Sequence, residues 1–550
     1  MSKRNIFNRI YIWVPLMIAA AVALGIIVGS RFHKQGYIGD GDRKINTILN
    51  LINDQYADTV NIDDLVEMTI PKMLAGLDPH TVYIPASDVE DVNGELEGSF
   101  SGIGVSFQVM NDTVTVVEVV PNGPSEKVGI LTGDRIIAVD DSTLIGVQQS
   151  DVMKRLRGPK GTKVKLSIKR NTSAKPLTFE VTRSDIPVES IDAFYFLSEG
   201  VAYIKVNMFG RHTYEDFLNV AFKLERGGAK SYVIDLRGNG GGLLDVAMLM
   251  ANEFLEPNRL IVYTKGREHR VSQEYWSDGT GAFRNAEVVV LIDEFSASAS
   301  EVFAGALQDN DRGLIIGRRS FGKGLIQQQF SLPDKSAVRL TIGRYYTPSG
   351  RCIQKQFKPG DENGYTLEVY DRFSRGEAYN KDSIKVDKEQ VFHTTTGRTV
   401  YGGGGIIPDI FVPNDTTHLT NYYFAVANAG LLQKFAFAYT DINRKELDKV
   451  KSAEQLLKLL PPDDVLLDDF VSYAAENGIP KRWYYINISK PLIVNQLKAL
   501  IVRDVFDMSH YYEVYNATDK VVQTALKSLK SGKARFPIMP EQPKPGAKKK

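Results

Sequence analysis

The sequence predicts a multidomain α/β protein with an inserted β-rich module, helical regions on both sides and one N-terminal transmembrane helix. Residues 201–347 alternate apolar, β-type runs with helical patterns, which is typical of a layered α/β fold. Residues 98–182 alternate apolar and polar residues between turn signals, as half-buried strands do. Residues 10–29 contain no charged residue, which predicts a membrane span.

Bulk composition limits the classes of function. The chain has 550 residues, enough for several domains, and an ordinary apolar fraction of 43%. Its formal net charge of +1 excludes a bulk attraction to nucleic acid. Cys352 is the single cysteine, so an internal disulfide is excluded. This fits a cytosolic protein or an envelope protein that avoids thiols.

The N-terminal segment, residues 1–30, is expected to be an uncleaved membrane anchor. At about 1.5 Å rise per residue, the apolar run over residues 10–29 spans roughly 30 Å, the thickness of a bilayer's hydrocarbon core. Lys3, Arg4 and Arg9 precede the run and favour a cytoplasmic N-terminus. A cleaved signal peptide is the alternative, but the run is long for one and no clear A-x-A site follows it.

The other regions follow from local pattern. Residues 40–97 carry apolar residues at helical spacing, and residues 98–182 form the β-rich module. Residues 183–414 are the α/β core, with a polar insertion at about 355–400. Residues 415–535 are mostly helical, and the tail at 536–550 is expected to be disordered.

A cluster of serines separates a strand pattern from a helix pattern in "LIDEFSASASEVFAGALQDN". A serine at a strand-to-helix turn exposes its hydroxyl, and the helix N-terminus offers free N–H groups to a developing oxyanion. Because a serine hydroxyl is a weak nucleophile, it needs a base. Ser298 is therefore a candidate nucleophile. The alternative is that Ser296, Ser298 and Ser300 only cap and pack the helix.

A lysine between two glycines is the candidate base. Lys323 lies in "SFGKGLIQ", where glycines allow close backbone approach and apolar neighbours lower the pKa of the amine. A neutral lysine can accept the proton of a serine hydroxyl. The alternative is a turn lysine that faces solvent or a phosphate. The stretch lacks the spacing of a nucleotide-binding P-loop, so this class of site is excluded.

Two glycine-containing stretches add backbone N–H groups. In "VIDLRGNGGGLLDVA" an apolar strand runs into a glycine turn whose N–H groups are candidate oxyanion donors. A tightly packed turn is the alternative, and the spacing excludes the dinucleotide motif G-x-G-x-x-G. The stretch "GIGV", residues 102–105, opens the β-rich module and is either a nest for a peptide carboxylate beside a strand edge or an ordinary hairpin turn.

Together these motifs resemble the carboxyl-terminal processing, or tail-specific, proteases of the S41 type. The module with "GIGV" and "VVPNGPSEKVGILTGDRIIAVD" is similar to a PDZ domain, and "DLRGNGGGLL", "FSASASEVFAGALQDN" and "SFGKGLIQ" are similar to the protease core. The resemblance covers about residues 77–347 and resumes at "GGGGIIPDI". It implies a crotonase-like or Clp-protease-like α/β core. The insertion and the region past residue 414 depart from the pattern.

The resemblance also implies roles for single residues. Ser298 would be the nucleophile, Lys323 the base, and Gln327 the residue that positions the lysine. The implied oxyanion donors are the N–H of Ala299 and that of one glycine, either Gly241 or Gly242.

Substrate binding is implied for the β-rich module. Its carboxylate-binding loop would consist of Gly102, Ile103, Gly104 and Val105. In similar proteases an arginine at the position of Arg157 couples peptide docking to the active state. The alternative for Arg157 is a solvated surface charge.

The expected function is a membrane-anchored serine endopeptidase that binds free C-termini of protein or peptide substrates through the PDZ domain. The expected location is a bacterial inner membrane, single-pass, with the catalytic domain in the periplasm. We expect no metal, cofactor or nucleic-acid partner, and the C-terminal helices allow a homo-oligomer.

Other classes remain open from the sequence alone. A membrane-anchored PDZ scaffold with a degenerate core would need a missing serine or lysine, and an acyl-CoA enzyme of the crotonase kind would bind CoA. A Ser-His-Asp triad would use His212 or His269, although neither lies in a motif. His80 in "LDPHTVY" is expected to be structural.

Overall fold

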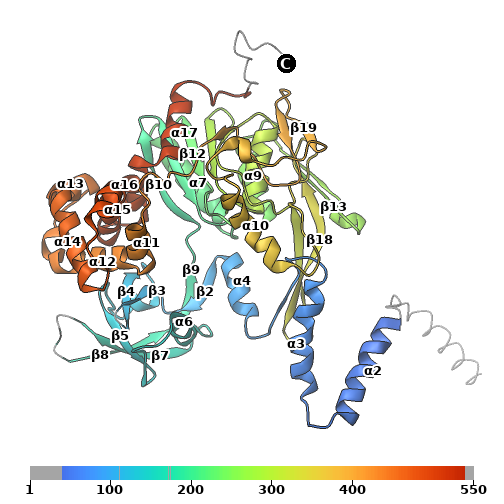
Figure 1. Cartoon of the computed structure of the whole chain (residues 1–550), viewed down its shortest axis with the longest axis horizontal. Helices are drawn as coiled ribbons and strands as arrows, with labels where there is room; N and C mark the ends of the chain where they lie inside the picture. The colour runs from blue at the N-terminus through green and yellow to red at the C-terminus, as the bar shows by residue number, and fades with distance from the viewer. Residues whose placement is uncertain (1–39, 111, 171–172, 174, 539–550) are drawn as a thin grey trace, which may run out of the picture. The chain divides into compact units, whose positions relative to one another are not determined.

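The computed structural model describes residues 40–110, 112–170, 173 and 175–538 (Figure 1). The chain divides into two compact units, with the boundary after Met73. The described part of the first unit consists of α2 (Asp40–Gln55) and most of α3 (Ile62–Ala75). The membrane helix predicted for residues 10–29 lies outside the described residues. Within the described ranges, no helix is both long and apolar enough to cross a bilayer.

A six-stranded sheet is the centre of the second unit. Its strands, in spatial order, are β10 (Ile191–Ser198), β11 (Val201–Val206), β12 (Ser231–Asp235), β15 (Glu287–Ile292), β16 (Leu314–Gly317) and β21 (Ile410–Phe411). All neighbours from β11 onward are parallel, and β10 is antiparallel to β11. The inner strands read as continuous apolar runs because both faces of this sheet are covered.

Helices from distant parts of the chain cover the two faces. The apolar core on one face is shared with α7 (Thr213–Arg226), α8 (Leu244–Asn252) and α9 (Ala299–Asp309). The opposite face packs against Val521, Val522, Ala525 and Leu529 of α17 (Lys520–Lys530), drawn in red (Figure 1). The predicted α/β core is therefore a three-layer structure that includes the last described helix.

A second sheet carries part of the site. Its strands are β1 (Val82–Ile84), β13 (Leu260–Gly266), β14 (Glu274–Trp276), β17 (Leu325–Ser331) and β18 (Ala337–Tyr346). Strand β18 pairs with β1, β13 and β17. The region 40–97, expected to be helical, therefore supplies a strand to the core before α4 (Val89–Glu97). The Asp78 carboxylate turns the chain there by accepting the N–H groups of His80 and Thr81.

The predicted β-rich module is a separate sheet on a two-stranded stem. Its strands are β3 (Val105–Met110), β4 (Thr113–Val119), β5 (Arg135–Val139), β6 (Ser142–Thr143), β7 (Lys163–Lys169) and β8 (Leu177–Thr182), with helices α5 (Pro124–Lys127) and α6 (Gln149–Leu156). A core of buried Val, Ile and Leu fills it. The chain enters through β2 (Ser99–Gly102) and leaves through the paired strand β9 (Ser184–Pro187).

The insertion predicted at about 355–400 folds onto the core. It contains α10 (Glu362–Ser374) and the hairpin β19 (Val391–His393) with β20 (Thr399–Tyr401). The helix was not predicted because its sequence is mostly polar. It buries only Tyr365, Val369 and the charged Arg372.

The helical C-terminal region divides into a bundle and a core helix. The bundle consists of α11 (Asn421–Asn428), α12 (Leu431–Leu447), α13 (Ala453–Leu459), α14 (Asp463–Glu476), α15 (Trp483–Val505) and α16 (Met508–Tyr515), which share one apolar core. The tail was expected to be disordered from residue 536, but Ile538 is 5% exposed and donates its N–H to the Asp311 carbonyl at 2.8 Å. Residues 539–550 lie outside the described part.

Candidate active site

Ser298 lies at a strained turn between β15 and α9. Its φ of 56° and ψ of −117° are unusual for a residue with a side chain, and it is the N-cap of α9. The neighbouring serines are fully buried and bind the glycine turn: Ser296 Oγ donates to the Leu236 carbonyl at 2.8 Å, and Ser300 Oγ to the Asn239 carbonyl at 3.0 Å. Two serines are therefore structural, and Ser298 is the partly exposed one.

Glu301 joins the turn of Ser298 to the loop of Lys323. Its carboxylate is 1% exposed and accepts the N–H of Ser298 at 2.9 Å and that of Lys323 at 2.8 Å. It also accepts the N–H of Gly322 at 2.7 Å and the hydroxyl of Ser320 at 2.5 Å. Burial raises the pKa of Glu301 to about 6, although these hydrogen bonds act in the opposite direction.

The sequence motifs did not single out Glu301. A signal was present, because a serine followed three residues later by glutamate is the pattern of a capping box. The sequence alone does not indicate that the same carboxylate also binds a loop more than twenty residues away.

Lys323 is held by Gln327. Lys323 Nζ donates to Gln327 Oε1 at 2.9 Å, and Gln327 Nε2 donates to the backbone carbonyl of His80. Burial lowers the pKa of Lys323 below its ordinary value, the Arg339 guanidinium acts in the same direction, and the Glu301 carboxylate opposes it. In the part of the chain that the structure describes, Lys323 Nζ and Ser298 Oγ do not hydrogen-bond.

Tyr345 makes a second connection between the two loops. Its hydroxyl lies 3.1 Å from the Ser298 carbonyl and also contacts the Lys323 carbonyl. The structure therefore places Ser298, Lys323 and Gln327 in one region, linked through Glu301 and Tyr345.

The glycine turn packs directly against Ser298. A Cβ atom on Gly241, which has φ of 105°, would lie 2.7 Å from Ser298 Cβ and 2.9 Å from the N–H nitrogen of Ala299. Buried Asn239 connects the two turns, because its Oδ1 accepts the Gly241 N–H at 2.8 Å and its carbonyl accepts the Ala297 N–H at 3.0 Å. Among the described residues, the N–H groups of Gly242 and Ala299 have no acceptor.

The loop predicted to bind a carboxylate opens strand β3. Gly104 has φ of 76°, and its carbonyl accepts the Val120 N–H at 3.0 Å. The Ile103 carbonyl accepts both the N–H and the hydroxyl of Ser125. Within the described ranges, β3 pairs with β4 alone, so its other edge is open at Val105 and beyond.

Arg157 contacts the stem of the module. It ends α6, and its guanidinium carbon lies 4.5 Å from the ring centre of Phe100 in β2. Phe100 pairs with Ile186 of β9, the strand that returns to the core. Arg157 is therefore a half-buried residue at the junction and not only a solvated surface charge.

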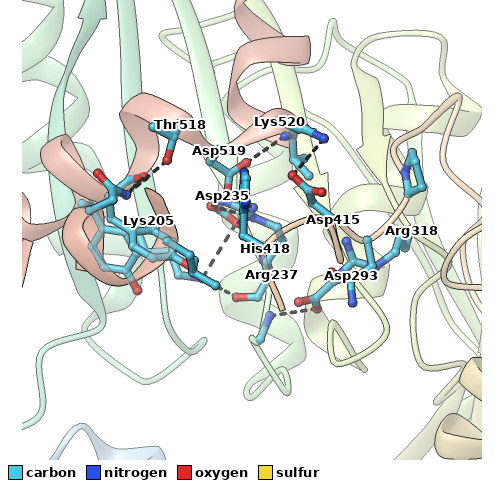
Figure 2. A pocket seen from close by; sticks show the side chains of 18 of the residues that line it. Lys205, Asp235, Arg237, Asp293, Arg318, Asp415, His418, Thr518, Asp519 and Lys520 are labelled. Carbon is cyan, nitrogen blue, oxygen red and sulfur yellow. Dashed lines mark hydrogen bonds and ion pairs between the residues drawn. The ribbon is translucent and has the colours of Figure 1, made fainter. Parts of the chain in front are cut away.

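A charged pocket of about 620 Å³ lies where the carboxyl ends of the central strands meet the C-terminal helices (Figure 2). Arg237, which precedes the glycines, binds Asp235 at 2.6 Å and Asp519 at 2.7 Å. Burial opposes ionisation of Asp235, but Arg237 and Lys205 outweigh it and lower its pKa to about 2. The pocket thus connects the glycine turn to the N-cap of α17.

Comparisons with known proteins match these parts. A model of peptidase family S41 matches residues 200–362, a PDZ domain model matches residues 101–182, and a model of a family of unknown function (DUF8443) matches residues 422–507. The carboxy-terminal-processing protease of Bartonella bacilliformis is 35% identical over 315 residues, which cover 56% of this chain and 72% of that protein.

Two further similarities concern named proteases. The carboxy-terminal processing protease CtpB of Bacillus subtilis is 32% identical over 64% of this chain and 73% of its own length. The solved structure of the photosystem II D1 C-terminal processing protease is 25% identical, covers 67% of this chain and 92% of that chain, and has a TM-score of 0.34.

The fold and the matches define a multidomain serine peptidase with a PDZ domain. The chain belongs to peptidase family S41, among the carboxy-terminal processing serine peptidases.

Proposed function

We propose that this peptidase binds the free C-terminus of a protein substrate and cleaves the substrate with a dyad of Ser298 and Lys323. We also propose that residues 10–29 anchor it in a bacterial inner membrane with the catalytic domain in the periplasm. The observation that carries the dyad is Glu301, which binds the backbone N–H groups of both residues. A partly exposed serine and a half-buried lysine of lowered pKa are the features that a serine–lysine mechanism needs.

Proton transfer begins the reaction. Neutral Lys323 Nζ accepts the Ser298 hydroxyl proton while Oγ forms a bond to the scissile carbonyl carbon. The N–H groups of Ala299 and Gly242 receive the oxyanion, since the Gly241 N–H is already donated to Asn239. The tetrahedral intermediate collapses, the C–N bond breaks, and the lysine returns its proton to the leaving amine.

Water completes the cycle. Neutral Lys323 takes a proton from a water molecule, whose oxygen attacks the acyl carbonyl. The ester bond to Ser298 Oγ then breaks, and the proton returns to the serine oxygen. Gln327 keeps the amine in place by accepting a hydrogen bond from it between these transfers.

Substrate docks on the PDZ domain by strand addition. The open edge of β3 supplies backbone hydrogen bonds to an extended peptide, and the loop of Gly102, Ile103, Gly104 and Val105 receives the terminal carboxylate. Arg157 couples this binding to the core through its contact with Phe100 in the stem strand β2. Substrates are therefore proteins or peptides with free C-termini in the envelope.

The dyad is tested with Ser298→Ala and Lys323→Ala in the full-length chain. Both variants are expected to lose peptide cleavage by at least about 10³-fold while keeping the thermal midpoint of the wild type. A fluorophosphonate probe should label the wild type and not Ser298→Ala. Turnover near the wild-type rate in the lysine variant would show that another group is the base.

The location is tested separately. Cell fractionation should place the full-length protein with inner membranes, and protease added to spheroplasts should digest the catalytic domain. Deletion of residues 1–30 should release the protein from membranes without loss of peptidase activity. Recovery of the full-length protein in the soluble fraction would exclude the anchor.

A further inference from the structure

The insertion that separates the two parts of the protease core packs against the loop of Lys323. Helix α10 approaches the segment 319–324, and residues just before α10 run beside it: the Gly324 N–H donates to Gln354 Oε1 at 2.8 Å, and the Lys355 N–H to the Gly322 carbonyl at 2.9 Å. The insertion therefore borders the residue proposed as the base.

Arg372 of α10 binds the backbone of this loop. Its Nη1 donates to the Ser320 carbonyl at 2.7 Å and its Nη2 to the Phe321 carbonyl at 2.8 Å. The side chain is buried, and Glu368, one turn earlier, accepts its Nε at 3.0 Å. A planar guanidinium with fixed donors is suited to hold two successive carbonyls in one orientation.

Tyr365 of α10 reaches Lys323 by a second route. Its hydroxyl hydrogen-bonds to His80 Nε2 at 2.9 Å, and the two rings meet edge to face at 5.0 Å. The backbone carbonyl of His80 accepts Gln327 Nε2, and Gln327 Oε1 accepts Lys323 Nζ. The orientation of the amine thus depends on a chain of contacts that starts on the insertion.

The helix is itself anchored by buried charge. Lys355 Nζ lies 3.2 Å from Glu368 and donates to the Tyr365 carbonyl at 2.8 Å, and it sits 3.9 Å from the ring centre of Phe321. Burial lowers the pKa of Lys355 to about 8 and that of His80 to about 4, so His80 is neutral in ordinary buffers. These contacts fix α10 relative to both Phe321 and His80.

We infer that α10 is a positioning element of the catalytic base, in which Arg372 sets the backbone of the Lys323 loop and Tyr365 sets the His80–Gln327 support of its amine. The inference rests on the proposed dyad and adds a role for a segment that lies outside the catalytic motifs. Neither Arg372 nor Tyr365 is expected to contact substrate.

The test compares two target variants and two matched controls of the full-length protein. Tyr365→Phe removes one hydroxyl and keeps the ring beside His80, and Arg372→Met removes the guanidinium. Tyr370→Phe is the matched tyrosine control, because Tyr370 lies on the same helix and is 58% exposed. Arg375→Met is the matched arginine control, because Arg375 binds Glu368 and Glu377 but not the loop.

The expected result is a loss confined to the chemical step. Tyr365→Phe and Arg372→Met should lower kcat by about 10- to 100-fold, as displacement of a catalytic group does. KM for a peptide substrate and affinity for a C-terminal peptide should stay within about twofold. Both controls should keep kcat within about twofold, and Arg372→Lys should recover part of the lost rate, because one ammonium can bind one carbonyl.

Two outcomes would overturn the inference. Wild-type kcat in Tyr365→Phe, with Lys323→Ala inactive, would show that the base does not depend on α10 although the dyad holds. Equal losses in the target and control variants would mean that α10 acts through stability alone. Activity in Lys323→Ala would instead refute the dyad, so failure of the two proposals is distinguishable.

Discussion

At the scale of single residues, Gly241 packs directly against the proposed nucleophile. Its φ of 105° is in the region that favours glycine, and a side chain would enter the space beside Ser298 Cβ and Ala299 N. Gly241→Ala should lower kcat by about 10²-fold or more by displacing the oxyanion donors. Steady-state kinetics with a peptide substrate measures this.

Gly240 offers the matched control for that substitution. A Cβ atom there would meet nothing within 4 Å, and the residue does not need a positive φ. Gly240→Ala should therefore keep activity close to that of the wild type. Similar losses in both variants would mean that the turn is sensitive to any methyl group, and not that Gly241 packs on the catalytic serine.

Two titrating groups at the site predict the pH dependence of catalysis. Because burial lowers the pKa of Lys323, its neutral form should appear at lower pH than for a free lysine, and kcat/KM should rise with pH until that pKa is passed. Below about pH 6, Glu301 takes up a proton and no longer accepts all of its backbone donors, so the fall should become steeper. A pH–rate profile of kcat/KM checks both limbs.

The effect of Glu301 on stability has the opposite pH dependence to its effect on catalysis. Its pKa is raised in the folded state from 4.5 to about 6, so the folded protein holds this proton more tightly. Its contribution to stability is present below pH 4.5 and is lost as the pH rises through about 6. As the pH is lowered, activity should therefore be lost near pH 6 while the protein is still folded. Circular dichroism at the same pH values measures the folded fraction. Coincident loss of activity and structure would contradict this assignment.

At the scale of elements, α6 and the stem of β2 and β9 connect the PDZ domain to the core. Arg157→Ala removes the contact with Phe100 and should reduce cleavage of protein substrates by about tenfold, while a C-terminal peptide still binds with wild-type affinity. Fluorescence anisotropy with a labelled peptide, alongside cleavage rates, separates these effects.

Arg155 serves as the control for that junction. It precedes Arg157 in the same helix, is exposed, and donates to the Thr143 carbonyl within the PDZ domain. Arg155→Ala should leave both cleavage and binding unchanged. Loss of peptide affinity in Arg157→Ala would instead place this residue in the binding site.

At the scale of the whole molecule, the C-terminal region meets the catalytic core at the glycine turn. Asp519 caps α17 through its Oδ1, and its Oδ2 binds Arg237, two residues before Asn239 (Figure 2). Asp519→Asn keeps a cap acceptor and removes the charge. It should lower kcat by about three- to tenfold, because Arg237 loses one of its two carboxylate partners. The loss stays small because Asp235 still binds Arg237.

The same pocket contains the control for Asp519. Asp415 pairs with Lys520 at 2.8 Å (Figure 2), and its other hydrogen bonds among the described residues are with Thr417 and not with the glycine turn. Asp415→Asn should leave kcat unchanged. If both variants reduced activity equally, general loosening of the C-terminal helices would explain the result better than the Arg237 contact.

Much of this architecture could be predicted from sequence because its signals are local. Runs such as Val288–Ile292 are apolar because they lie between two layers of helices, and turn residues mark the strands of the PDZ domain. The order of the motifs around Ser298 and Lys323 indicated the family, which the comparisons confirm. Helix α10 was not predicted within the polar insertion, because it buries only a small set of residues.

The sequence by itself determined the class of peptidase, its PDZ domain and the candidate nucleophile and base, because each depends on short motifs with fixed spacing. Only the tertiary structure decided which of the three serines is partly exposed and which glycine N–H already donates to Asn239. It alone also showed that Glu301, His80, Tyr365 and Arg372 lie around the site. The physical reason is distance along the chain: apart from the local hydrogen bonds of Ser298 to Glu301 and of Gly241 to Asn239, these contacts join segments tens to hundreds of residues apart, and no local pattern encodes a hydrogen bond between such segments.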